Sequence, residues 1–163
     1  LQRLTGVTEV VLLDAVGLEG DDTDGHIDQL ARFIDRENIV VCVSSDPHDK
    51  HASGLDQNLS QLKTWAETTS PRPDLHHLPA PATRRINGQP VPQSYCNFLR
   101  LGPERLLVPQ FHAPEDDYAA GLLRELSGAD VTQVDCSDLA WGLGALHCAS
   151  RDQPKYNTID AIR

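Results

Sequence analysis

Three side chains in the sequence have the chemistry needed for nucleophilic catalysis: His26, Asp28 and Cys148. A thiolate can attack an electrophilic carbon, while a histidine and a carboxylate handle the protons and charge of the reaction. His26 and Asp28 are two residues apart, so on an extended chain both would face the same ligand. His147 directly precedes Cys148, but neighbours on an extended chain point in opposite directions. The more distant His26 is therefore the better candidate base.

The segment that contains His26 is acidic and follows a predicted strand. Residues 19–28 read Glu-Gly-Asp-Asp-Thr-Asp-Gly-His-Ile-Asp, and loops at strand ends commonly carry functional groups. The pattern does not fit a calcium loop, because with Gly25 at the turn position Gly20 would fill the first ligand slot and Ala31 the final glutamate slot. Taken alone, the segment is equally compatible with a solvated acidic turn.

The candidate nucleophile ends a glycine-containing run. Residues 141–148 read Trp-Gly-Leu-Gly-Ala-Leu-His-Cys, and glycines permit tight backbone geometry before the thiol. A cysteine after a strand is, by itself, more often a packed core residue. The other three cysteines, Cys42, Cys96 and Cys136, lie in predicted strands without close spacing, which predicts buried free thiols rather than disulfides or a zinc site. Reduced thiols in turn predict a cytoplasmic location.

The elements that must position these groups form a repeating pattern. Short apolar runs predict strands at residues 9–13, 39–43, 74–78, 95–101, 105–108 and 131–136. Apolar residues at helical spacing predict helices at 55–67 and 114–126. A hairpin, a helix and a strand therefore follow one another twice, in modules of roughly sixty to seventy residues. Within the first module, the Pro-rich segment 69–93 is expected to form an irregular excursion.

This order predicts a single α/β domain over residues 1–163, made of two complete modules with a remnant at each end. The first remnant is the strand at 9–13, and the second begins near Trp141. Such a set has open edges, which repeat architectures cover with neighbours or by closure. The chain contains no Met, so we do not expect Leu1 to be a natural start.

Composition narrows the classes of partner. The net charge is −10, from 24 acidic and 14 basic side chains. This balance argues against a nucleic-acid partner, which requires a basic face, and is more compatible with a cationic ligand. No apolar run is long enough to span a membrane.

The sequence resembles the C-terminal half of the agmatine deiminases and the related bacterial peptidylarginine deiminases. The matching motifs occur in the order found in that family, at residues 18–28, 31–33, 94–98, 108–111, 135–136, 141–144 and 147–148. The resemblance implies the pentein fold, a pseudo-fivefold α/β propeller of ββαβ modules.

The resemblance also implies an activity: hydrolysis of agmatine to N-carbamoylputrescine and ammonia, a step of putrescine biosynthesis. Cys148 would form a covalent intermediate with the guanidinium carbon, and His26 would be the general acid and base. Asp28 would bind the guanidinium as a paired carboxylate. Other substrate-binding residues would be Asp22, Trp141, Gly142 and Gly144. No cofactor and no metal are implied.

Some positions depart from the family pattern. The family's N-terminal half supplies a second guanidinium-binding carboxylate in a Trp-x-Arg-Asp motif, which neither Trp65 nor Trp141 begins. Ala145 stands where a second glycine is usual, and residues 149–154 replace a more typical Thr-Gln-Gln run. Peptidylarginine or free arginine is thus an alternative substrate. The chain could also be a non-catalytic fragment or assembly module that pairs with itself or with a missing N-terminal half.

Overall fold

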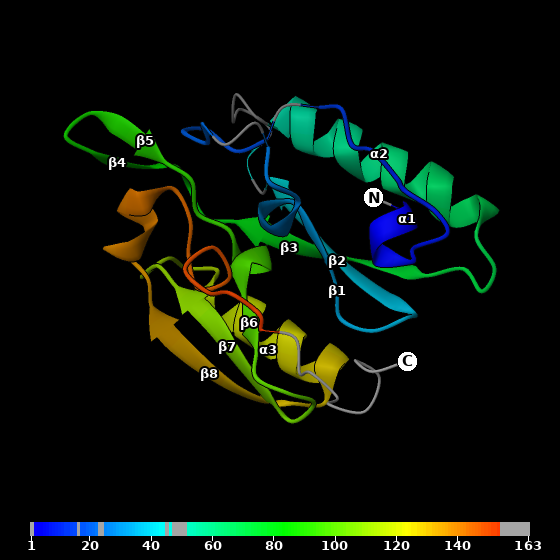
Figure 1. The fold of residues 1–163 in the computed structure, drawn as a ribbon. Coiled ribbons are helices and arrows are strands. Elements are labelled where there is room, and N and C mark those ends of the chain that lie inside the picture. Colours follow the sequence, from blue (N-terminus) through cyan, green and yellow to red (C-terminus); the bar gives the residue numbers. More distant parts are fainter. Residues whose placement is uncertain (1, 16, 23–24, 45, 47–51, 154–163) are drawn as a thin grey trace.

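The computed structural model describes residues 2–15, 17–22, 25–44, 46 and 52–153, which form a mixed α/β structure (Figure 1). Its helices and strands in chain order are α1 Gln2–Thr5, β1 Ala31–Phe33, β2 Asn38–Ser44, α2 Ala52–Thr68, β3 Asp74–Ala80, β4 Arg84–Ile86, β5 Gln89–Val91, β6 Leu99–Arg100, β7 Arg105–Gln110, α3 Asp116–Ser127 and β8 Asp130–Asp135. Three short 3₁₀ helices, η1 Ile27–Gln29, η2 Tyr95–Asn97 and η3 Leu139–Gly142, complete the described elements.

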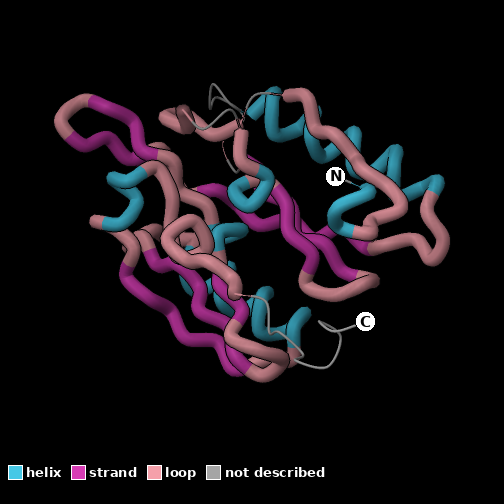
Figure 2. Tube along the Cα trace, in the orientation of Figure 1, coloured by secondary structure: helices cyan, strands magenta, loops and turns pink. Residues whose placement is uncertain are grey.

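Two three-stranded sheets share one topology (Figure 2). β1 pairs antiparallel with β2, and β2 pairs parallel with β3, in a register that places Val40 opposite His76. β6 and β7 are likewise antiparallel, and β7 and β8 are parallel, with Val108 opposite Gln133. Each parallel crossover passes through a helix, α2 in the first sheet and α3 in the second. The strand–strand–helix–strand order expected from the sequence thus occurs twice.

The two helices form where apolar residues recur at helical spacing. In α2 the buried side chains include Leu55, Leu59, Leu62 and Ala66, which lie on one stripe that packs on β2. α3 carries Asp116 and Asp117 in its first turn, where carboxylates favour the positive end of the helix dipole. Its C-terminal cap is Gly128, whose φ of 62° places it in the left-handed region and whose N–H donates to the carbonyl of Arg124.

One hydrophobic core joins the two sheets. A single buried cluster contains side chains from β2, β3, β7, β8 and both long helices, among them Val40, Cys42, Leu55, Leu78, Leu106, Val108, Leu123 and Val131. The alternate residues of β2, Ile39 and Val41, contact a second cluster with Leu59 and Leu62. β2 is therefore buried on both faces, which agrees with its nearly continuous apolar sequence.

Three of the expected elements are corrected by the structure. Residues 9–13 are not a strand: they lie as an extended loop beside α2, where Leu12 is 80% exposed and Glu9 accepts a hydrogen bond from Trp65. Segment 69–93 is more regular than expected: besides β3, which the run 74–78 predicted, it contains the hairpin β4–β5. Residues 95–101 begin as η2 and only end as strand β6, because Ser94 caps the turn by accepting from the N–H of Cys96.

Among the described residues, no helix has the length and apolar character needed to cross a membrane.

Candidate functional site

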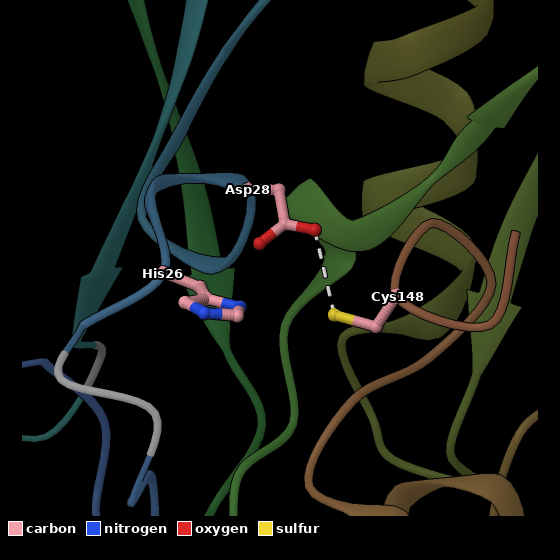
Figure 3. Close-up of side chains that lie close together, drawn as sticks. All are labelled: His26, Asp28 and Cys148. Atoms are coloured by element: carbon pink, nitrogen blue, oxygen red, sulfur yellow. Dashed lines mark hydrogen bonds between the residues drawn. The ribbon is translucent and has the colours of Figure 1, made fainter. Parts of the chain in front are cut away.

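The structure brings His26, Asp28 and Cys148 together (Figure 3). One imidazole nitrogen of His26, one carboxylate oxygen of Asp28 and the Cys148 sulfur all lie within 4.8 Å of one another. The thiol of Cys148 donates to Oδ2 of Asp28 at 3.4 Å. His26 and Cys148 are exposed and Asp28 is partly buried, so the group is open to a ligand.

The backbone around His26 and Asp28 differs from the extended chain that the sequence suggested. His26 is the residue that precedes η1, with φ −59° and ψ 124°, and Asp28 lies within that 3₁₀ helix. The two side chains converge because His26 is still extended while η1 has already turned. The acidic turn before them packs against the β4–β5 hairpin: a Cβ on Gly20, whose φ is 89°, would lie 2.4 Å from the carbonyl oxygen of Pro90.

Cys148 lies in a tight turn that follows η3. The N–H of Ala149 donates to the carbonyl of Ala145 at 3.0 Å, and the N–H of Ser150 donates to that of His147 at 3.0 Å. Gly144 is required by this turn, since a Cβ there would lie 2.5 Å from Cβ and 2.7 Å from Sγ of Cys148. Gly142 has no such neighbour, with open space within 4 Å of its ideal Cβ.

His147 also belongs to the site, contrary to the expectation that it would point away. Its Nδ1 lies 2.6 Å from Oδ2 of Asp28. The expectation failed because it assumed an extended chain, whereas the turn at residues 145–149 directs His147 and Cys148 toward the same carboxylate.

Asn97 is a further residue of the site that the sequence analysis did not single out. It lies at the end of η2 and is 1% exposed. Its Nδ2 donates to Oδ2 of Asp28 and to Sγ of Cys148, each at 3.1 Å. The role of Asn97 was missed because residues 95–101 were expected to form a strand, where an asparagine does not by itself indicate a function. Its place in the motif 94–98 was the one available clue.

The other expected substrate-binding residues lie outside this group of three. Asp22 is exposed in the loop before His26, and Trp141, at the end of η3, is 49% exposed. Gly142 is exposed and Gly144 is buried beneath the nucleophile. The role of these four residues in substrate binding therefore stays a prediction.

The pKa values of Asp28 and Cys148 are shifted in opposite directions. Burial raises the pKa of Asp28, but hydrogen bonds from His147 and Cys148 outweigh it, so the pKa lies below its usual value. Burial raises the pKa of the Cys148 thiol; the hydrogen bond from Asn97 lowers it, and the negative charge of Asp28 adds to the rise. In the resting state the site therefore pairs an ionised carboxylate with a protonated thiol.

The same three side chains are potential ligands for a soft divalent cation. A thiolate, an imidazole and a carboxylate match the number of protein ligands in catalytic zinc sites, one fewer than in structural zinc sites.

Comparison with known proteins defines the family. The sequence profile of the Porphyromonas-type peptidyl-arginine deiminases matches residues 1–154. The chain belongs to this family, as its motifs indicated.

Individual relatives agree with this assignment. A Legionella pneumophila protein, provisionally named agmatine deiminase, is 29% identical over 156 residues, which cover 94% of this chain and 44% of the relative. Among solved structures, an agmatine deiminase of C. jejuni with substrate bound is 30% identical, with a TM-score of 0.80 over 90% of this chain and 42% of that one. A Porphyromonas gingivalis protein, provisionally named arginine deiminase, is 36% identical with a TM-score of 0.83, over 90% of this chain and 43% of that one. The chain spans less than half the length of these relatives.

Proposed function

We propose that this chain supplies the nucleophilic half of the active site of a guanidine deiminase, a hydrolase of carbon–nitrogen bonds, with agmatine as substrate. The observation that carries the proposal is the convergence of His26, Asp28 and Cys148 within 4.8 Å. The C. jejuni relative, an agmatine deiminase whose structure contains substrate, supports agmatine. The products would be N-carbamoylputrescine and ammonia.

The first half of the reaction forms a covalent intermediate. Asp28 binds the planar guanidinium by its paired oxygens, and this cation offsets the negative charge that, in addition to burial, raises the pKa of the Cys148 thiol. The Cys148 thiol passes its proton to His26, and the resulting thiolate attacks the central carbon to form a C–S bond. The C–N bond to one terminal nitrogen breaks, and this nitrogen leaves as ammonia with a proton from His26.

The second half consumes one water molecule. His26 takes a proton from the water, whose oxygen attacks the same carbon. The C–S bond breaks, the hydroxyl proton of the intermediate passes to the Cys148 sulfur, and the ureido product leaves. The proton left on His26 converts the ammonia to ammonium. Asp22, Trp141, Gly142 and Gly144 would border the bound substrate.

The family description favours a second substrate class, arginine in peptides, and the name of the Porphyromonas gingivalis relative favours free arginine. Kinetic comparison of agmatine, arginine and an arginyl peptide, with the full-length parent protein, separates these candidates. We expect ureido product in proportion to ammonia, with the highest kcat/KM for agmatine. Unchanged turnover in Cys148→Ser would exclude Cys148 as the nucleophile, and no turnover of any of the three substrates would overturn the proposal.

We further propose that the two strand–strand–helix–strand units, with their remnants, are part of one larger pentein propeller domain in the cytoplasm. The pairing surface would include an apolar groove of about 560 Å³ beside the site, lined by Val11, Ile27, Phe33, Ile39 and Trp65 among others. Phe33, on edge strand β1, is 62% exposed. The remainder of a longer protein would occupy this groove, because the relatives are more than twice as long as this chain. Light scattering of the 163-residue chain tests this: a stable, active monomer would contradict it, and a dimer would indicate self-pairing.

A further inference from the structure

Asn97 occupies the centre of the site and is held there from both sides. Its helical turn, η2, is fixed by Ser94, whose hydroxyl accepts from the N–H of Cys96 at 3.1 Å and donates to the carbonyl of Gln29 at 2.7 Å. Gln29 itself donates to the carbonyl of Leu143 at 3.1 Å. Through Ser94 and Gln29, the helical turn of Asn97 is thus hydrogen-bonded to the segments that carry Asp28 and Cys148, without any contact from the Asn97 side chain.

The amide oxygen of Asn97 organises the turn of the nucleophile. It accepts from the backbone N–H groups of Ala145 at 3.0 Å, His147 at 3.1 Å and Cys148 at 3.1 Å. The backbone carbonyl of Asn97 also accepts from His147. An apolar side chain at this position would leave the backbone N–H groups of Ala145 and Cys148 without this acceptor.

The amide nitrogen of Asn97 performs a different task on the opposite side. It has two N–H donors, and its neighbours are Oδ2 of Asp28 and Sγ of Cys148, both at 3.1 Å. A donor shared by a carboxylate and a sulfur favours the ionised form of each. It also offsets the repulsion that arises between Asp28 and Cys148 when the thiol loses its proton.

We propose that Asn97 is the positioning residue of this site: its oxygen holds the turn that presents Cys148, and its nitrogen stabilises the thiolate against the Asp28 charge. The inference rests on the proposed function of Cys148 as nucleophile. The position requires an acceptor and a donor on one short, planar group. Aspartate matches the shape but replaces the donor with a second negative charge, so Asn97→Asp keeps an acceptor for the turn, removes the donor to the sulfur and adds a charge that opposes the thiolate.

The test measures the ionisation of Cys148 without turnover. Cys42, Cys96 and Cys136 are buried and Cys148 is exposed, so iodoacetamide alkylation of the native 163-residue chain, followed from pH 6 to 11 by mass spectrometry, reports on this thiol. Cys148→Ser is the blank. In Asn97→Asp we expect the alkylation profile to move to higher pH and the rate at pH 8 to fall about tenfold, the equivalent of one pKa unit.

Two further variants control for charge and for folding. Asn87→Asp makes the same amide-to-acid change at an exposed position of the β4–β5 turn and should alkylate like wild type. The double variant Asp28→Asn with Asn97→Asp restores one amide and one carboxylate, and we expect its profile to return toward wild type. Circular dichroism establishes that each variant is folded. If Asn97→Asp does not fold, Asn97→Ser, which keeps a hydroxyl donor and acceptor but shortens the reach, should show the same direction of change.

An Asn97→Asp protein with native circular dichroism and a wild-type alkylation profile would overturn the inference. A profile altered equally by Asn87→Asp would also do so, because the effect would then be one of net charge. Since alkylation does not require a guanidine substrate, a chain that turns over no agmatine can still pass this test. Failure of the proposed function and failure of this inference therefore give different results.

Discussion

Nδ1 of His147 lies 2.6 Å from Oδ2 of Asp28, across 119 residues of sequence. His147 belongs to the same turn as Cys148, and its contact holds the Asp28 carboxylate in place. The residue next to the nucleophile therefore helps to keep Asp28 ionised for a guanidinium. It also accounts for much of the lowering that keeps Asp28 ionised against the effect of its burial.

Replacing His147 with alanine should raise the pKa of Asp28, because the hydrogen bond and the charge interaction that lower it are lost. The carboxyl carbon of Asp28, followed by NMR across a pH titration of aspartate-labelled protein, gives the measurement, with Asp28→Asn for assignment. His112→Ala is the matched control. His112 contacts Asp135 at 3.1 Å, and that carboxylate has a pKa of about 2, set mainly by hydrogen bonds from Ser137. The control should raise the pKa of Asp135 and leave Asp28 unchanged.

Removing the charge of Asp28 should make Cys148 more reactive near neutral pH. The pKa of the thiol lies above its ordinary value partly because the Asp28 carboxylate disfavours the thiolate. In Asp28→Asn that contribution disappears, so the pKa falls and alkylation at pH 8 accelerates, while the maximal rate at high pH changes little. A slower reaction at pH 8 in Asp28→Asn would show that Asp28 favours the thiolate, contrary to this structure. Glu9→Gln, an exposed carboxylate far from the thiol in sequence, serves as the control for net charge.

Two glycines of the same run should respond differently to alanine. A Cβ on Gly144 would lie 2.5 Å from Cβ of Cys148, whereas one on Gly142 would have open space within 4 Å. Gly144→Ala must displace the nucleophile or its turn, and overpacking of this kind costs about 1–3 kcal/mol. We expect urea unfolding to show that loss for Gly144→Ala, together with an altered rate of Cys148 alkylation. Gly142→Ala should match wild type in both measurements, and equal effects in the two variants would contradict the packing seen here.

The buried hydroxyl of Tyr95 should contribute measurably to stability. It donates to Oδ1 of Asp116 at 2.7 Å, and burial together with this bond raises its pKa. Tyr95→Phe keeps the ring contact with Phe111 but leaves the buried Asp116 one donor short. We expect the free energy of unfolding to fall by about 1–3 kcal/mol. Tyr118→Phe removes a hydroxyl from a side chain that is 57% exposed and should change stability by less than about 0.5 kcal/mol.

The sequence was sufficient for much of the fold, because the strongest patterns are those of periodicity. The apolar stripe of α2 and the apolar run of β2 can each be recognised within the sequence of a single element. Strand 9–13 was wrong because its apolar residues have the composition of a strand but no pairing partner in the described part of the chain. Pairing is a property of the tertiary structure, which a local run does not contain.

Some residues of the candidate site could likewise be found from the sequence, and others could not. Residue type made His26, Asp28 and Cys148 candidates, since few side chains can act as nucleophile, base and cation-binding group, and the resemblance to the deiminase motifs singled them out. Asn97 and His147 depend on turn geometry: one is a neutral amide inside an apolar run, and the other faces Asp28 because its backbone is curved. Neither property can be deduced from spacing that assumes an extended chain.

The single core that joins the two sheets has a consequence for cooperativity. His26 and Asp28 precede the first sheet, whereas Asn97 and Cys148 flank the second, so no one unit contains a working set of groups. With the units sharing buried side chains, neither can lose its structure and leave the other intact. Melting should therefore be all-or-none, and the pKa shifts of Asp28 and Cys148 should be lost in the same transition as the fold.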